Sequence, residues 1–190
     1  MANKITKERV AVVIGRFQPF TISHLKLVRA AYDKLGLKIV IGIISSERSS
    51  IKNDRDYFST NIVKNYMGVI ERSYKMIEDV LVFENMNAFQ VMEKIAEKYD
   101  VASLFCGSDR YPVYKKMEDY ADDLGLDEGF QVREVYRTND ELSATDARNA
   151  ILNKNKNKYK EVVDHNLATD EMYELLSSNL ISPSRRSNKK

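Results

Sequence analysis

The sequence predicts an α/β fold: a doubly wound, Rossmann-like parallel sheet of about five strands, with helices on both faces and a helical segment near the C-terminal end. Two observations predict it. Short runs rich in Val and Ile alternate along the chain with longer segments whose apolar residues recur at helical spacing. Such alternation is typical of parallel strands joined by helices. The length of 190 residues also suits one sizeable domain.

The first strand and the first helix have the clearest boundaries. A β-branched run over residues 10–14 indicates a buried strand, which Gly15 and Pro19 bring to an end. From Leu25 onward, apolar residues at helical spacing predict a helix. The later elements follow the same two patterns. We expect strands at residues 9–14, 38–44, 79–83, 101–106 and 131–136, and helices near residues 23–35, 60–76, 87–98 and 112–124 and from about residue 145.

The C-terminal part differs from the rest in composition. An amphipathic pattern near residues 169–180 predicts one further helix that packs back on the domain or on another subunit. Two basic runs, residues 153–160 and 182–190, are interpreted as solvated surface, since so few charges give only weak, salt-sensitive contact with nucleic acid. We therefore expect a Rossmann-like domain over residues 1–152, a helical appendage over 153–181 and a flexible basic tail over 182–190.

The overall composition excludes several classes of protein. The chain is 43% hydrophobic and 31% charged with a formal charge of +2, which gives no general attraction to nucleic acid or to a membrane surface. It has no apolar run of about 18 residues, and its N-terminus is polar, unlike a secretory signal. The single Cys106 forms no internal disulfide, and two histidines with one cysteine argue against a zinc site. These features predict a cytoplasmic protein.

The most informative segment is residues 15–24, which read Gly-Arg-Phe-Gln-Pro-Phe-Thr-Ile-Ser-His. It follows the first strand directly and opens the first helix. Unpaired backbone N–H groups and a partial positive charge meet at such a point, where a phosphate binds well. Arg16 and His24 flank it and add hydrogen-bond donors. We interpret the segment as a nucleotide-phosphate site, with an ordinary strand–turn–helix connection as the alternative.

A second segment, residues 143–148, reads Ser-Ala-Thr-Asp-Ala-Arg and follows the fifth strand. Ser143 and Asp146 have the spacing of a capping box, which explains these two residues as a helix start. A cap requires neither Thr145 nor Arg148, and both add anion-binding groups at a second helix N-terminus. Two such anion sites at one edge of a sheet suit a triphosphate.

Together the two segments resemble the nucleotidylyltransferase superfamily, whose signatures are an H/T-x-G-H loop after the first strand and a downstream S-x-T-x-x-R. The wording Gly-Arg-Phe-Gln-Pro-Phe is most similar to archaeal-type nicotinamide-nucleotide adenylyltransferases. The resemblance implies transfer of an adenylyl group from ATP to nicotinamide mononucleotide, giving NAD and pyrophosphate. It also implies Mg²⁺ held mainly by the substrate phosphates, and a homo-oligomer.

The resemblance further implies a role for each matching residue. His24 would contact the α-phosphate, and Arg16 and Arg148 the leaving pyrophosphate, as catalytic residues. The implied nucleotide and phosphate contacts are Gly15, Phe17, Thr21, Gly107, Asp109, Ser143 and Thr145. The implied acceptor contacts are Phe58, Asn87 and Phe89.

The sequence departs from the family at two places. Ser23 stands where the loop signature has Gly, and its hydroxyl is expected to cap the first helix. The chain has no Trp, and Gln90 occupies the position of the Trp that stacks on nicotinamide in the family. Two alternatives therefore stay open: transfer of AMP or CMP to a different phosphorylated acceptor, and a nucleotide-binding module without catalysis.

Overall fold

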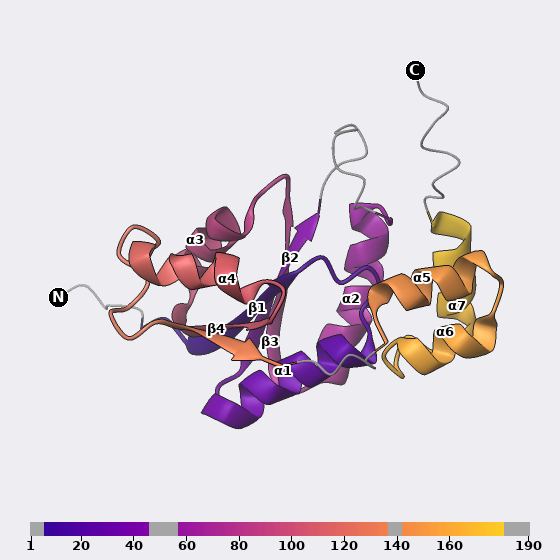
Figure 1. Ribbon diagram of the computed structural model, residues 1–190, viewed down its shortest axis with the longest axis horizontal. Helices are drawn as coiled ribbons and strands as arrows, with labels where there is room; N and C mark the ends of the chain where they lie inside the picture. Colours follow the sequence, from indigo (N-terminus) through magenta and orange to yellow (C-terminus); the bar gives the residue numbers. More distant parts are fainter. Residues whose placement is uncertain (1–5, 46–56, 137–141, 181–190) are drawn as a thin grey trace, which may run out of the picture.

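A computed structural model describes residues 6–45, 57–136 and 142–180 (Figure 1). Five parallel strands form one sheet in the order β3-β2-β1-β4-β5. The predicted Rossmann-like α/β fold is confirmed. The strands are β1 (Arg9–Gly15), β2 (Ile39–Ser45), β3 (Ile77–Glu84), β4 (Asp100–Gly107) and β5 (Gln131–Val135).

Helices cover both faces of this sheet, as predicted. Alternate residues of β1 point to opposite faces: Ala11 and Val13 join one hydrophobic cluster, whereas Val10 and Val12 join the other. The first cluster includes α1 (Ile22–Leu35), α2 (Thr60–Ser73), α5 (Ala144–Leu152), α6 (Lys156–Val162) and α7 (Asp170–Asn179). The second includes α3 (Ala88–Lys98), α4 (Tyr111–Tyr114) and the 3-10 helix η1 (Lys115–Tyr120).

The strand order reverses between β1 and β4. The chain runs outward from β1 through β2 to β3, and α3 then carries it back so that β4 pairs with the other side of β1. Ligands of doubly wound sheets bind at such a reversal, beyond the carboxyl ends of the strands. Gly15 and Gly107 end β1 and β4 at this point.

The segment predicted as one helix over residues 112–124 is different in the structure. It forms the four-residue helix α4 and then η1, followed by turns. A 3-10 helix places residues three apart on one face, and Tyr114 and Met117 are both buried in this way. The Glu118 carboxylate also accepts a hydrogen bond from the Val132 backbone N–H, 2.7 Å away, which fixes η1 against β5.

The basic run at residues 153–160 overlaps helix α6, which lies within the predicted helical appendage, although the run itself was interpreted only as solvated surface. Tyr159 and Val162 are fully buried, and the Tyr159 hydroxyl donates to the Leu167 carbonyl at 2.9 Å. The lysines of the run keep at least part of their surface exposed, as expected. Residues of α5, α6 and α7 share one hydrophobic cluster with α1 and α2. The domain boundary at residue 152 stays a prediction, and the tail over 182–190 lies outside the described residues.

Asp164 connects this C-terminal segment to the loop after β1. Its side chain is completely buried, and its carboxylate accepts hydrogen bonds from the Tyr74 hydroxyl at 2.6 Å and the Asn166 backbone N–H at 3.0 Å. Its backbone N–H donates to the Phe20 carbonyl at 3.3 Å. The preceding Val163 forms an antiparallel bridge with Thr21. The segment that contains Phe20 and Thr21 is therefore held by residues far downstream.

We expect Asp164→Ala to lower the free energy of unfolding by about 2–3 kcal/mol, because the half-buried donors of Tyr74 and Asn166 lose their buried acceptor. Urea unfolding followed by circular dichroism measures the change. Asp123→Ala, at an exposed turn, is the matched control and should stay within about 0.5 kcal/mol of wild type. A loss at Asp164 no larger than that of the control would contradict its role as an anchor.

Candidate functional site

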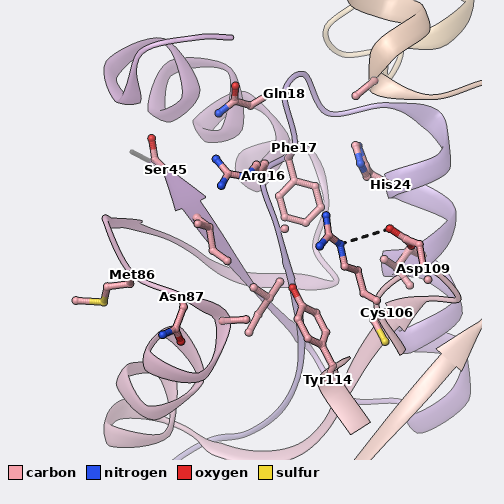
Figure 2. Close-up of a pocket in the computed structure, with 18 of the residues that line it drawn as sticks. Arg16, Phe17, Gln18, His24, Ser45, Met86, Asn87, Cys106, Asp109 and Tyr114 are labelled. Atoms are coloured by element: carbon pink, nitrogen blue, oxygen red, sulfur yellow. Dashed lines mark ion pairs between the residues drawn. The ribbon is translucent and has the colours of Figure 1, made fainter. Parts of the chain in front are cut away.

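A cavity of about 800 Å³ opens where the strand order reverses (Figure 2). Its walls come from the loop after β1, the first turns of α1 and α5, the end of β2, the start of α3 and the loop after β4. It therefore lies where a doubly wound sheet binds ligands. Eight of the residues predicted from the sequence line it, namely Gly15, Arg16, Phe17, His24, Asn87, Gly107, Asp109 and Arg148.

The other five predicted residues do not line the cavity. The Thr21 and Ser143 hydroxyls cap α1 and α5, and the Thr145 hydroxyl accepts a hydrogen bond from Arg148. Phe58 is fully buried against Tyr66, and Phe89 packs edge-on to Tyr120. Thr21, Ser143 and Thr145 thus shape the site through the helix ends. Phe58 packs in the core and Phe89 packs against Tyr120, and the acceptor contacts predicted for them stay a prediction.

His24 occupies the third position of α1 and completes a capping box with Thr21. The backbone N–H of Thr21 donates to Nδ1 of His24 at 3.0 Å, so Nδ1 must be unprotonated. In the neutral imidazole the proton then lies on Nε2. The ring packs against both Phe17 and Phe20, with centroid distances of 4.9 and 5.5 Å. His24 is thereby oriented as an N–H donor in the first turn of a helix.

The loop over residues 15–17 is closely packed. Phe17 has a positive φ of 49°, and its carbonyl accepts a hydrogen bond from the Tyr66 hydroxyl at 2.6 Å. A Cβ at Gly15 would lie 3.1 Å from the Phe17 ring, so a side chain there would displace the ring. Gly15 therefore allows Phe17 to fold back under the loop while Arg16 lines the cavity.

Gln18 joins three segments of the site, and the sequence did not single it out. Its side chain is almost fully buried, and Oε1 accepts hydrogen bonds from the backbone N–H groups of Tyr57 at 2.7 Å and Phe58 at 3.3 Å. Its backbone carbonyl accepts a hydrogen bond from Nη1 of Arg148 at 2.6 Å. The loop after β1, the start of α2 and helix α5 are thus fixed to one another.

Arg148 is held flat at the cavity wall. Its guanidinium carbon lies 3.8 Å from the centroid of the Tyr57 ring, and Nη2 donates to the Thr145 hydroxyl at 2.8 Å. A guanidinium presents five N–H donors in one plane, a geometry that matches phosphate oxygens. Tyr57 was also missed from the sequence, because its role depends on a contact with α5 that no local pattern reveals.

The starts of α1 and α5 lie side by side. The Ser23 hydroxyl donates to the Leu142 carbonyl at 2.8 Å, directly before α5. The expectation that Ser23 caps α1 is wrong, since Thr21 does so. The capping box of Ser143 and Asp146 is present, and the hydrogen bonds from Ser143 lower the pKa of the Asp146 carboxyl. Two helix N-termini thus meet at one cavity, a favourable place for an anion with several phosphates.

The wall formed by α3 is uncharged. Oδ1 of Asn87 accepts hydrogen bonds from the backbone N–H groups of Phe89 and Gln90, and Oε1 of Gln90 accepts one from the N–H of Asn87. Both amide oxygens are therefore used to cap the helix. The amide nitrogens of Asn87 and Gln90, beside Asn85 and Met86, give this wall hydrogen-bond donors without charge.

The loop after β4 forms the opposite wall. Asp109 and Arg110 make an ion pair with an Nε–Oδ2 distance of 3.4 Å, drawn as a dashed line in Figure 2. Cys106 also lines this wall. Burial raises the pKa of its thiol to about 12, which keeps the thiol protonated at neutral pH. Its expected role in strand packing agrees with its 2% exposed surface.

Over residues 6–45, 57–136 and 142–180, no group of three or more His, Cys, Asp or Glu side chains is arranged to hold a metal ion. None of the helices in these ranges has the length and apolar character needed to cross a membrane.

Two of the solved structures with similar folds come from bacteria. One is TmcAL of Thermotoga maritima bound with alpha-thio ATP, with a TM-score of 0.54 and 12% identity over 90% of this chain. The other is a macrolide-efflux protein of Streptococcus pneumoniae, with a TM-score of 0.56 and 17% identity over 83% of this chain. The chain spans 55% and 57% of the lengths of these two proteins. At such identities the likeness shows a shared fold.

No curated protein matches the chain. A family match, however, extends over residues 12–181, from β1 to the end of the described chain, and includes both helix starts of the cavity. It confirms the superfamily predicted from the two sequence segments. The chain belongs to the Cytidylyltransferase-like family of the nucleotidylyltransferase superfamily.

Proposed function

We propose that the protein transfers an adenylyl group from ATP to nicotinamide mononucleotide, forming NAD and releasing pyrophosphate. The observation that carries this proposal is that His24 and Arg148, on two adjacent helix starts, line one cavity at the strand-order reversal. The ATP analogue named with the Thermotoga maritima structure supports ATP as the donor. The sequence of residues 15–20, which resembles that of archaeal-type nicotinamide-nucleotide adenylyltransferases, favours nicotinamide mononucleotide as the acceptor.

The chemistry needs alignment and charge stabilisation rather than a protein base. The phosphate of the acceptor has a second pKa of about 6, so its oxygen is already anionic at neutral pH. It attacks the α-phosphorus of ATP in line, the bond from that phosphorus to the bridging oxygen breaks, and pyrophosphate leaves. Nε2–H of His24 donates to an α-phosphate oxygen as charge grows there. Arg16 and Arg148 bind the phosphates of the leaving group.

Mg²⁺ is proposed to accompany the triphosphate. Asp109 is the one carboxylate among the described residues that line the cavity, and Mg²⁺ commonly keeps its waters and binds substrate phosphates instead of a protein cage. When bound, the ion neutralises charge on the phosphates. A homo-oligomeric state is proposed with it by analogy with the family. A cytoplasmic location is proposed because the single cysteine suits a reducing compartment.

The α3 wall favours a second candidate, transfer of AMP or CMP to a different phosphorylated acceptor. Gln90 lines the cavity where a ring would stack on nicotinamide, and the chain contains no Trp. Asn85, Asn87 and Gln90 offer amide groups that suit polar, uncharged parts of several acceptors.

A panel of substrates tests the proposal and separates it from the second candidate. The protein is incubated with Mg²⁺, ATP or CTP, and one acceptor at a time: nicotinamide mononucleotide, pantetheine phosphate, a sugar phosphate or an alcohol phosphate. We expect pyrophosphate and NAD from ATP with nicotinamide mononucleotide. Pyrophosphate with another acceptor alone would favour the second candidate. Thermal stabilisation by ATP without pyrophosphate from any pair would indicate a binding module.

A further inference from the structure

Tyr114 is a buried polar side chain at the cavity that the roles above do not use. It is 6% exposed, yet its side chain lines the cavity, and Figure 2 shows its hydroxyl end turned into the open space below the ring of Phe17. Within the described parts of the chain, no other group forms a hydrogen bond with this hydroxyl. Buried hydroxyls normally have a partner, because leaving one unpaired costs free energy. A ligand in the cavity would supply the missing partner.

The surroundings of the Tyr114 hydroxyl make it a donor to an anion. Burial raises its pKa, so it stays protonated at neutral pH. The charged groups that face it are the guanidinium groups of Arg110 and Arg16 and the carboxylate of Asp109, a net positive set. Cys106 beside it is a protonated thiol. A phosphate oxygen matches this combination of one hydroxyl donor and two cations.

The position of Tyr114 separates it from His24 and Arg148, two of the residues proposed to bind the triphosphate. His24 and Arg148 come from α1 and α5, on the face of the first hydrophobic cluster. Tyr114 comes from α4 and belongs to the second cluster, together with Ala88 at the start of α3. The uncharged wall of Asn87 and Gln90 is therefore its neighbour on the same face. An acceptor whose body lies along that wall would bring its phosphate toward Tyr114.

We propose that the Tyr114 hydroxyl donates a hydrogen bond to the phosphate of the acceptor substrate, assisted by Arg110. This inference rests on the proposed nucleotidyl transfer and adds a site for the attacking group. Tyr114 orients that phosphate while the first turns of α1 and α5 hold the triphosphate. The acceptor is thus recognised as a phosphomonoester whose body makes polar contacts along the wall of Asn87 and Gln90.

Tyr114→Phe removes the hydroxyl and keeps the ring that packs against the second cluster. We expect KM for nicotinamide mononucleotide to rise about tenfold or more, as for a hydrogen bond to a charged group, with KM for ATP changed less than twofold. Binding is measured separately by titration calorimetry with nicotinamide mononucleotide and with nicotinamide riboside, which lacks the phosphate. Affinity should fall about tenfold for the mononucleotide and stay unchanged for the riboside. Tyr120→Phe, an exposed tyrosine of η1 outside the cavity lining, is the matched control and should behave as wild type.

Each other outcome has a definite meaning. An unchanged affinity of Tyr114→Phe for the mononucleotide, equal weakening of both ligands, or a raised KM for ATP alone would overturn the role of Tyr114. If wild type binds the mononucleotide but releases no pyrophosphate, the proposed function fails, and the binding comparison still decides on Tyr114. If wild type does not bind the mononucleotide at all, both proposals fall.

Discussion

Replacing His24 with alanine is expected to lower kcat about 100-fold or more, on the order of 3 kcal/mol of transition-state stabilisation. The reason is the fixed orientation of the imidazole. Nδ1 accepts the Thr21 N–H, so Nε2 carries the proton and can meet the charge that develops on the α-phosphate. Pyrophosphate release under saturating substrates measures the effect. Because a donor used mainly in the transition state adds little to ground-state binding, KM for ATP should change much less than kcat.

The same substitution removes part of the α1 cap, so its effect on folding must be separated from its effect on turnover. His24→Gln keeps a side chain that can complete a capping box and removes the imidazole. It should unfold at nearly the wild-type temperature and still lose most of the activity. Loss of the cap in His24→Ala should cost about 1 kcal/mol of stability. A His24→Ala enzyme within a few-fold of wild-type turnover would remove His24 from the mechanism.

Arg148→Ala is expected to raise KM for ATP by at least about tenfold and to lower kcat as well, because the guanidinium binds the phosphates before and during their departure. Arg148→Lys should recover only part of this loss, since an ammonium cannot match two phosphate oxygens in one plane. Steady-state rates at varied ATP, with the acceptor saturating, measure both constants. Wild-type KM for ATP in Arg148→Ala would show that the second helix start does not bind the triphosphate.

Tyr57 provides an indirect test of the same geometry. Tyr57→Phe keeps the ring on which the Arg148 guanidinium lies, whereas Tyr57→Leu removes it. The ring contact is worth about 0.5–2 kcal/mol, so Tyr57→Leu should raise KM for ATP several-fold and Tyr57→Phe should not. Equal behaviour of the two variants would mean that the ring does not position Arg148.

The sheet and most helices could be predicted because their signals are local. The β-branched run of β1 and the helical spacing of α1 are written in consecutive residues. The type of helix after Pro112 could not be predicted in the same way. Residues three apart, such as Tyr114 and Met117, lie close to one face in an α-helix as well as in a 3-10 helix, so their spacing does not distinguish the two. The bounds of helix α6 could not be predicted, because lysines surround Tyr159 in the sequence. The burial of Tyr159 depends on contacts with other elements of the same hydrophobic cluster.

For the candidate site, too, the sequence indicated the residues whose signal is local and missed the others. The sequence indicated Arg16, His24 and Arg148, which belong to two short segments at helix starts. Gln18 and Tyr57 were missed, because each acts through a contact between distant elements. Tyr114 was missed because the fold, and no local pattern, brings it to the cavity. Phe58 and Phe89 lie outside the cavity lining, and their predicted contact with an acceptor stays a prediction. A residue's position beside a family motif fixes its element but not the direction in which its side chain points.

The pairing of Thr21 with Val163, and of Phe20 with Asp164, has a consequence for how the molecule is made. A ribosome releases the N-terminal loop and all five strands long before residues 163 and 164 emerge. The sheet can therefore assemble early, while the backbone at Phe20 and Thr21, which orients the His24 imidazole, still lacks its contacts with Val163 and Asp164. We therefore expect the loop that contains Phe20 and Thr21 to reach its final geometry only after residues 163 and 164 have been synthesised and have joined the fold.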